Sequence, residues 1–360
     1  MHSMLKPEMV EAFSNVYDDY WYIMGNKLKM FEEEYAQFNR VNHAIGVSNG
    51  LDALFLCLKA LGVREGDEVI VPSNTFIATV LAVSYTGATP VFVEPDIQTY
   101  LIDPKNILRA ITSKTKAIMP VHLFGQACEM DKIMELAKTY DLKVVEDNAQ
   151  AHGSTFSGKI TGSWGNLNGV SFYPGKNLGA LGDAGAITTD SLEMAEKVRI
   201  LRNYGSNKKY HNCEIGYNNR LDELQAAILS IKLKYINQWN FERKEIASWY
   251  NQALKDIGDL ILPHTHEQST HVYHLYVIRT TKRDLLKEFL ENQEIGSIIH
   301  YPIPPHLQEA YKSLGYSRGD FPVAEELADS SLSLPLWPGM TRNDVDFVAE
   351  QIKHFFSDHM

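Results

Sequence analysis

Residues 67–94 read DEVIVPSNTFIATVLAVSYTGATPVFVE, and this stretch carries the clearest structural signal in the chain. A first apolar run, 67–72, ends in proline, and a second, 90–94, follows a helical pattern at 75–84. Short apolar runs separated by helical patterns are typical of strand–helix–strand units and of a mostly parallel sheet. The stretch therefore predicts an α/β fold whose central sheet is flanked by helices.

The same alternation extends from about Val47 to Asp190. It predicts further strands at 117–123, 142–147, 170–173 and 184–189, and a helix at 130–139. From Arg220, apolar residues recur at spacings of three and four, which predicts one long helix leaving the first domain. Beyond about Trp239 the chain has charged helical patterns, an apolar run at 272–278 and a closing helix at 343–356. We therefore expect a large α/β domain at 1–240 and a smaller C-terminal α+β domain at 241–360.

Composition excludes several classes of protein. The 360 residues carry 34 basic and 45 acidic side chains, a net charge of -11, whereas a nucleic-acid binder needs a positive surface. No apolar stretch approaches the roughly 20 residues of a membrane span. We therefore expect a cytoplasmic protein with no nucleic-acid or membrane partner.

Cysteine and histidine spacing gives no metal or disulfide signal. Cys57, Cys128 and Cys213 are scattered and form no C-x-x-C pair, which argues against a disulfide framework and a cysteine zinc site. The histidines at 264, 266, 271 and 274 are joined at ligand spacing only by Glu267. We expect no metal.

The chemistry is concentrated in residues 170–186, VSFYPGKNLGALGDAGA, an apolar run that enters a glycine-rich turn containing Lys176. A lysine at this edge of a parallel sheet lies where α/β proteins place ligands, although a solvated loop lysine is the plainer interpretation. Asp147 ends another apolar run, and it is either a helix cap or, beside a lysine, the partner of a pyridinium nitrogen. Ser48-Asn-Gly50 precedes a helical pattern and is either a simple N-cap or a phosphate site.

Six motifs occur in a fixed order along nearly the whole chain. They are SNG at 48–50, PSNTFIAT at 72–79, HLFGQ at 122–126, EDNAQ at 146–150, SFYPGKNLG at 171–179 and GYNNRLDELQ at 216–225. Together they resemble the pyridoxal-phosphate-dependent nucleotide-sugar aminotransferases, the DegT/StrS group of fold type I. The segment HYPIPPHLQ at 300–308 resembles the branch that aminates C3 of dTDP-linked 3-keto-6-deoxyhexoses.

The resemblance implies a role for each motif residue. Pyridoxal 5'-phosphate would form a Schiff base with Lys176, the catalytic residue, and Asp147 would contact the pyridine nitrogen. Gln150 would lie near the phenolic oxygen and Phe76 on the ring. The expected phosphate ligands are the amides of Gly50 and Leu51, the Ser171 hydroxyl, and Asn218 of a second subunit. A homodimer with shared active sites is therefore implied.

The resemblance also implies a reaction. L-glutamate would give its amino group to C3 of a dTDP-linked 3-keto-6-deoxyhexose, and the dTDP-3-amino-3,6-dideoxyhexose would serve glycan biosynthesis, such as O-antigen of lipopolysaccharide or an S-layer. For the substrate we expect contacts from Tyr173, Lys208, Tyr210, His300 and Tyr301. The basic strip that contains Lys208 and Tyr210 is equally well interpreted as a solvated loop.

Several alternatives stay open at this point. A 4-aminotransferase or a UDP-keto-sugar aminotransferase would share every cofactor motif, and a non-catalytic, cofactor-binding regulatory protein is the alternative from another class. The presence of Lys176 argues against the related dehydratases, which carry histidine there. A nicotinamide dinucleotide enzyme lacks support because no G-x-G-x-x-G follows a strand. Asn148, Leu51 and Ala184 depart from the residues usual in the family, which puts the hydrogen bonds near Asp147 in question.

Overall fold

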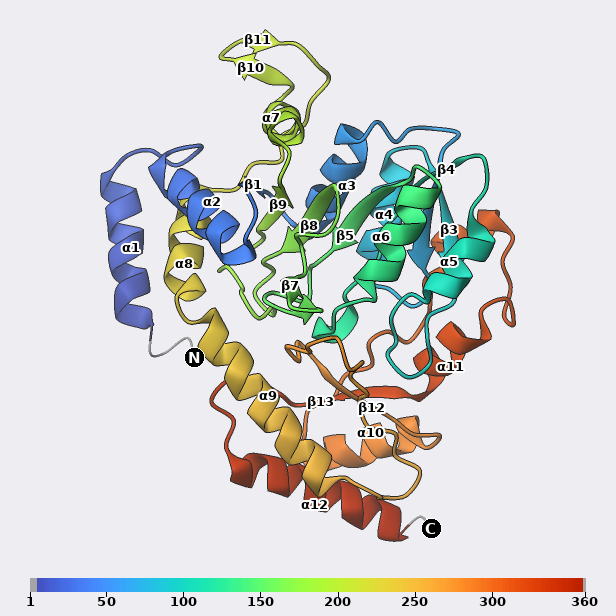
Figure 1. The fold of residues 1–360 in the computed structure, drawn as a ribbon. Helices are drawn as coiled ribbons and strands as arrows, with labels where there is room; N and C mark the ends of the chain where they lie inside the picture. The colour runs from blue at the N-terminus through green and yellow to red at the C-terminus, as the bar shows by residue number, and fades with distance from the viewer. Residues whose placement is uncertain (1–4, 359–360) are drawn as a thin grey trace.

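The computed structural model describes residues 5–358, and its centre is a seven-stranded sheet between two layers of helices (Figure 1). The strand order is β1-β9-β8-β5-β4-β2-β3. The strands are β1 (His43–Val47), β2 (Glu68–Pro72), β3 (Thr89–Val93), β4 (Thr115–Ile118), β5 (Lys143–Asp147), β8 (Leu167–Ser171) and β9 (Gly185–Thr189). Only β9 runs antiparallel to its neighbours within this sheet. The predicted α/β class with a mostly parallel sheet is confirmed.

Helices cover both faces of the sheet because each presents an apolar side to it. One face is covered by α3 (Gly50–Ala60), α4 (Ile77–Tyr85) and α7 (Leu192–Leu201). The other face is covered by α5 (Pro104–Ala110), α6 (Met130–Thr139), α2 (Asn26–Asn39) and α8 (Glu223–Leu233). The outermost helix, α1 (Lys6–Asp18), packs against α8.

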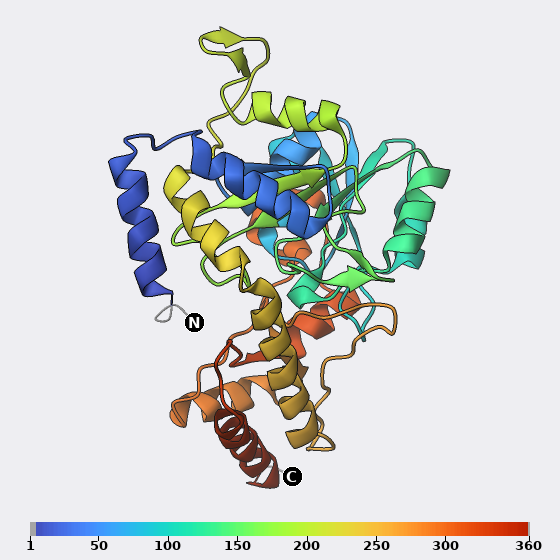
Figure 2. The ribbon, with the colours of Figure 1, turned by 60° about the vertical axis from the view of Figure 1, so that its left-hand side comes forward.

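Two short hairpins lie outside the main sheet. One pairs β6 (Thr155–Phe156) with β7 (Lys159–Ile160), and the other pairs β10 (Ser206–Lys208) with β11 (His211–Asn212). The second hairpin stands clear of the body beyond α7, at the end of the molecule opposite the C-terminal elements (Figures 1 and 2).

The C-terminal part has an apolar cluster of its own. The long helix α9 (Ile236–Ala253) leads into it (Figure 2), and β12 (Tyr276–Arg279) pairs antiparallel with β13 (Ser331–Leu334). The remaining elements are α10 (Arg283–Asn292), η2 (Pro305–Leu307), η3 (Glu309–Leu314), α11 (Pro322–Ser330) and α12 (Arg342–Asp358). The cluster joins α9, α10 and α12 through Tyr250, Leu286 and Ile352. The expected boundary between residues 240 and 241 falls inside α9 and stays a prediction.

A carboxylate ties the C-terminal part to the central sheet. Glu94, at the end of β3, accepts hydrogen bonds from the amides of Val323 (2.7 Å) and Ala324 (3.1 Å) in the first turn of α11. These amides have no acceptor within their own helix, and an acidic group suits the positive end of the helix dipole. The contact therefore fixes where the C-terminal part lies relative to the carboxyl ends of the strands.

The structure differs from the sequence prediction at several element boundaries. The expected single helix from Arg220 is two helices, α8 and α9, and the apolar spacing runs through their junction at Tyr235 without marking it. The apolar run at 117–123 is a strand only to Ile118, because the chain then turns into the short 3-10 helix η1 (Leu123–Gly125). No helix within residues 5–358 has the length and apolar character needed to cross a bilayer.

Candidate active site

Lys176 lies on the loop that joins the antiparallel neighbours β8 and β9. Its amide donates to the carbonyl of Tyr173 (2.8 Å), so the backbone is fixed in a tight turn. Burial lowers the pKa of Lys176 to about 8, although the negative charge of Asp147 raises it in part. A lysine with this pKa has a substantial neutral fraction near neutral pH, which a nucleophile or a proton acceptor requires.

Asp147 ends β5, the strand adjacent to β8, and it is almost fully buried. Its Oδ2 accepts from the Thr79 hydroxyl (2.8 Å) and its Oδ1 from the amide of Ala149 (3.1 Å). Burial raises the pKa of this carboxyl, while the two hydrogen bonds and the charge of Lys176 lower it. Sequence reasoning missed Thr79, although its hydroxyl lies within the quoted motif 72–79. The carboxylate is therefore held in one orientation beside a potential cation.

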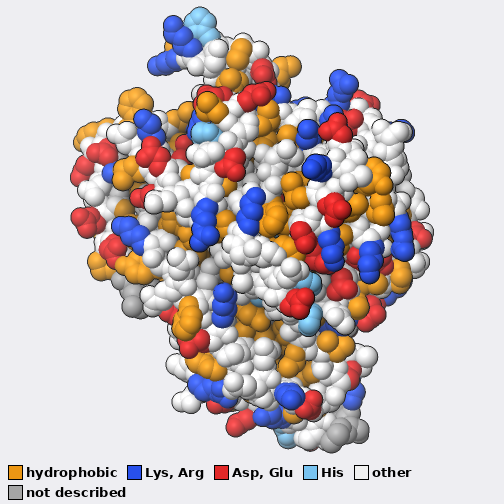
Figure 3. Space-filling view, viewed as in Figure 1, with side chains coloured by type: hydrophobic (Ala, Val, Ile, Leu, Met, Phe, Trp, Pro, Cys, Tyr) orange, Lys and Arg blue, Asp and Glu red, His pale blue; other side chains and the backbone are white. Residues whose placement is uncertain are grey.

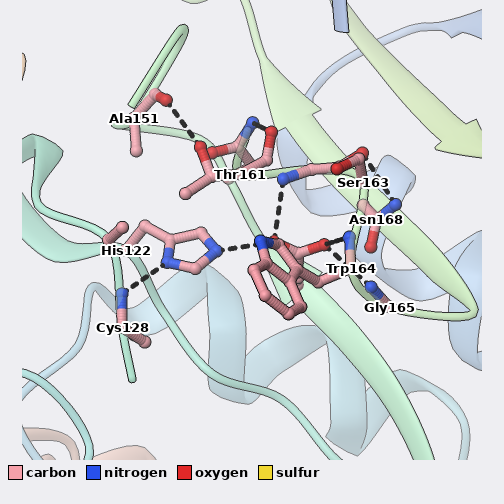
Figure 4. A network of polar contacts seen from close by, with 12 residues as sticks. His122, Cys128, Ala151, Thr161, Ser163, Trp164, Gly165 and Asn168 are labelled. Carbon is pink, nitrogen blue, oxygen red and sulfur yellow. Dashed lines mark hydrogen bonds and ion pairs between the residues drawn. The ribbon is translucent and has the colours of Figure 1, made fainter. Parts of the chain in front are cut away.

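A second buried carboxylate, Glu146, precedes Asp147 on β5 and accepts hydrogen bonds from His122 and from a loop that includes Trp164 and Gly165, three residues labelled in Figure 4. The His122 ring accepts from the amide of Cys128 at Nδ1 (3.0 Å), so its proton is on Nε2 and is donated to Glu146 (2.8 Å). The same carboxylate accepts from the amides of Gly162 (2.8 Å), Trp164 (2.6 Å) and Gly165 (2.9 Å). Four donors on one buried carboxylate make this a rigid support for the adjacent Asp147.

Asn148, which departs from the residue usual in the family, does not disturb the hydrogen bonds of the neighbouring Asp147. Its side chain is buried and donates to the carbonyl of Thr161 (3.3 Å), in the loop that Glu146 also holds. The two hydrogen bonds of the Asp147 carboxylate come from Thr79 and Ala149. The substitution therefore leaves them intact.

The N-terminus of α3 approaches the end of β8. Asn49 caps this helix by accepting from the amide of Asp52 (2.8 Å), while the amides of Gly50 and Leu51 belong to the first turn, which has no intrahelical acceptor. A Cβ on Gly50 would lie 2.6 Å from the Cβ of Ser171, so only glycine allows this approach. Free amides, the helix dipole and a nearby hydroxyl together can hold an anion.

Side chains from the C-terminal part complete the site. The ring of Tyr301 lies 5.2 Å from that of half-exposed Phe76, and its hydroxyl accepts from Nε2 of Gln150 (3.1 Å). His300 bonds through Nδ1 to the hydroxyl of Ser333 (2.8 Å). Burial and the charge of Lys176 lower the pKa of His300 to about 4, so this imidazole is neutral at physiological pH.

Two more histidines influenced by Lys176 were not assigned to this site from the sequence: His152, and His274, which was considered only as a metal ligand. His152 is fully buried and stacked on Phe172 (5.7 Å), and neither ring nitrogen has a hydrogen-bond partner among residues 5–358. Burial lowers its pKa to about 3, and it likewise lowers the pKa of His274. The positive charge of Lys176 also lowers the pKa of both imidazoles, so the histidines near the lysine are uncharged at physiological pH. The signal for His152 was its place two residues after the EDNAQ motif.

The structure does not bring all expected residues together within one chain. Tyr173 is on the Lys176 loop but more than half exposed. Lys208 and Tyr210 belong to the projecting hairpin, where Figure 3 shows basic side chains and a histidine, and Asn218 is exposed beside the end of α7. These last three residues lie away from the C-terminal elements that carry His300 and Tyr301 (Figure 1). No cluster of three or more metal-ligating side chains is present in the described part of the chain.

Comparison with known proteins gives a consistent result. The DegT/DnrJ/EryC1/StrS aminotransferase family matches residues 3–353. A protein of Aneurinibacillus thermoaerophilus named dTDP-3-amino-3,6-dideoxy-alpha-D-galactopyranose transaminase is 51% identical over 348 residues, 97% of this chain and 95% of the relative. A protein of Acidithiobacillus ferrooxidans named UDP-N-acetyl-3-dehydro-alpha-D-glucosamine 3-aminotransferase is 42% identical over 349 residues, 97% of this chain and 94% of its own.

Solved structures agree with the sequence comparison. DesV of S. venezuelae, solved in complex with a ketimine intermediate, is 43% identical with a TM-score of 0.97, and the match covers 98% of this chain and 95% of that one. The PLP form of the sugar aminotransferase Spr1654 of Streptococcus pneumoniae is 26% identical with a TM-score of 0.91, covering 98% and 96%.

The residues present fit pyridoxal phosphate. A lysine of lowered pKa suits its aldehyde, a buried and oriented carboxylate suits its ring nitrogen, and Gly50 keeps open an anion cradle at the start of α3 that suits its phosphate. The protein is a pyridoxal-phosphate-dependent enzyme, and the chain belongs to the DegT/DnrJ/EryC1/StrS aminotransferase family.

Proposed function

We propose that the protein is a sugar aminotransferase that moves the amino group of L-glutamate to C3 of a dTDP-linked 3-keto-6-deoxyhexose, giving a dTDP-3-amino-3,6-dideoxyhexose for glycan biosynthesis. The main support for this substrate is the 51% identity with a transaminase named for a dTDP-3-amino-3,6-dideoxy sugar. The paired Lys176 and Asp147 support the chemistry.

The geometry supports a role for each cofactor-site residue. The bound cofactor supplies a carbonyl carbon that exchanges an amino group and a ring that withdraws electrons from it. Nζ of Lys176 would anchor the cofactor and, once released as a neutral amine, would carry a proton between the substrate carbon and the former carbonyl carbon of the cofactor, which lie on either side of the transferred nitrogen. Asp147 would keep the ring nitrogen protonated, and Gly50, Leu51 and Ser171 would hold the phosphate. Phe76 would cover the ring, and Gln150 would contact the phenolic oxygen.

A second copy of the chain would complete the site. Asn218, Lys208 and Tyr210 are exposed, and the β10–β11 hairpin that carries the last two lies at the end of the molecule opposite the C-terminal elements, so we propose that all three reach the phosphate and the sugar nucleotide of a partner. Exposed aromatic side chains near the N-terminus support this homodimer, because a lone chain would leave them in water. They are Phe13, Tyr17, Tyr20, Trp21 and Tyr22.

For the sugar itself we propose Tyr173, His300 and Tyr301. Burial raises the pKa of Tyr301 to about 12, so its hydroxyl keeps its proton, and His300 is neutral. Both can therefore form hydrogen bonds to sugar hydroxyls or to the keto oxygen without adding charge. The positive groups needed for the diphosphate would come from the β10–β11 hairpin.

Cofactor capture should depend on pH through Lys176. The pKa of Lys176 is lowered to about 8, and only the neutral amine attacks the aldehyde. By simple titration, the fraction of neutral amine should fall about tenfold for each pH unit below that value. The expected result is that the rate of absorbance change on mixing cofactor-free protein with pyridoxal phosphate rises with pH and levels off above about 8. The control is N-acetyl-lysine, whose rate should keep rising toward its ordinary pKa of about 10.4. A plateau only near pH 10 would contradict the lowered pKa.

Product analysis tests the reaction itself. Purified protein is incubated with L-glutamate and, separately, dTDP-linked 3-keto and 4-keto 6-deoxyhexoses and a UDP-linked 3-keto sugar. We expect turnover with the dTDP-linked 3-keto sugar, a product of the mass expected for replacement of C=O by CH–NH2, and an NMR correlation that locates the amine on C3. An amine on C4, or preference for the UDP sugar, would replace the proposed substrate with one of those alternatives. No turnover with any of them would favour a cofactor-binding regulatory protein.

The UDP-linked alternative has a specific observation in its favour. The 42% identical relative from Acidithiobacillus ferrooxidans is named for a UDP-linked 3-keto sugar, so the cofactor motifs are compatible with either nucleotide. Both relatives are named for amination at C3, which favours that position over C4.

A further inference from the structure

Helix α8 holds the loop that carries Lys176. Gln225 Oε1 accepts from the amide of Leu181 (2.9 Å), and Nζ of Lys232 donates to the carbonyl of Gly179. Positions 225 and 232 are two helical turns apart and therefore on one face of the helix. A single face of α8 thus contacts two points of the loop a few residues beyond Lys176.

The loop transmits this contact to Lys176 because it is folded tightly on itself. A Cβ on Gly179 would lie 2.4 Å from the carbonyl oxygen of Pro174, so the two ends of the turn are in direct contact. Within the turn, the amide of Lys176 donates to Tyr173, and the amide of Ala180 donates to Phe172, both at 2.8 Å. Any shift of Gly179 therefore moves Pro174 and the backbone of Lys176.

Lys232 is an unexpected residue in this position. It is only 1% exposed, and no carboxylate oxygen of residues 5–358 forms an ion pair with it. Burial lowers its pKa to about 8, which reflects the cost of a cation removed from water. A leucine or methionine would fill the same space without that cost, so packing alone does not explain a lysine here.

We propose that Lys232 is a positioning residue for the amination reaction, holding the carbonyl of Gly179 so that the Lys176 backbone stays in place while its side chain is bound or free. The proposal rests on the assigned role of Lys176. During turnover the amine of Lys176 must leave the cofactor and return as a proton carrier, and the loop loses that covalent tether in between. A fixed backbone then keeps Nζ within reach of the reacting carbon.

The test compares Lys232→Met, which keeps the length of the side chain but removes its donors, with Lys234→Met, the same change at an exposed lysine that caps the same helix. Hydrogen exchange is measured on the cofactor-free proteins at the amides of Lys176, Ala180 and Leu181. We expect faster exchange at all three in the first variant and no change in the control. The kcat of the first should fall about 10- to 100-fold, in line with the loss caused by a displacement of about 1 Å, while KM changes little.

If Lys232 only stabilised the fold, its replacement would lower stability and activity together, and melting temperatures distinguish that case from the proposal. Lys232→Met removes a buried cation, which favours folding, but it also leaves the buried Gly179 carbonyl without its donor, so the two effects oppose each other and the melting temperature should change little. Unchanged exchange, or a loss of kcat matched by a loss of folded protein, would overturn the proposal. Lys232→Leu, which also removes the donors, serves the same comparison if the methionine variant is insoluble. The exchange measurement uses no substrate, so its outcome is separate from whether the protein aminates the proposed sugar.

Discussion

Lys176→Ala is expected to lose the visible absorbance band of the lysine-bound cofactor and to lose turnover. The variant removes both the anchoring amine and the proton carrier, and a positioned acid–base group alone contributes about 10²–10⁴-fold. Because the lysine is partly buried and its pKa is lowered, replacement by alanine should not lower the melting temperature. Absorbance spectra after addition of pyridoxal phosphate and steady-state kinetics measure the two effects.

Two comparisons separate this result from general damage. Lys138→Ala, at an exposed lysine of α6, should retain the band and the rate. Small primary amines added to Lys176→Ala should restore part of the proton transfer, because they can enter the space of the missing side chain. A variant that keeps both the band and most of its turnover would show that another residue carries the cofactor.

Asp147→Asn is expected to have the next largest effect. An amide has the size of the carboxylate but no charge, so it no longer favours a protonated ring nitrogen. We expect kcat to fall about 10²–10³-fold, similar to removal of one electrostatic stabilising group from an active site. The fold should be retained, since burial raises the pKa of Asp147 and its charge is thus unfavourable for folding.

Glu146→Gln provides the matched comparison one residue earlier. All donors to Glu146 point at its two oxygens, so a glutamine NH2 group would face an N–H donor instead of accepting from it. A buried donor left without an acceptor costs about 1–3 kcal/mol, so this variant should lose stability. If Asp147→Asn lost stability and kept its kcat, Asp147 would have a structural role and not the proposed role in the reaction.

The sequence predicts the parts of this protein that depend on local pattern. Apolar runs locate six of the seven strands of the main sheet, all except β1, which was not predicted. The rule that parallel strands present their carboxyl ends at one edge then places Lys176 near Asp147. Helix α6 is predicted with its observed bounds, 130–139, because its apolar residues recur at helical spacing. These features need no knowledge of how the layers pack.

Other parts depend on packing and could not be predicted from the sequence. The bond from Thr79 to Asp147 requires the start of α4 and the end of β5 to be in contact, although 68 residues separate them. Lys232 sits in a helical pattern where a charged residue is normally assigned to the solvent side, yet the Lys176 loop covers it. The roles proposed for Lys208, Tyr210 and Asn218 depend on a second chain, which no pattern within one sequence describes.

The reversed direction of β9 has a consequence for how the site forms. Ser171 and Gly185 are paired neighbours in adjacent strands, so the Lys176 loop begins and ends at one point of the sheet. A closure between residues so near in sequence has a small entropic cost and forms early compared with the long parallel crossovers. Lys176, the proposed Schiff-base lysine, therefore belongs to a locally closed unit, and contacts from α8 need only fix a loop whose two ends already meet.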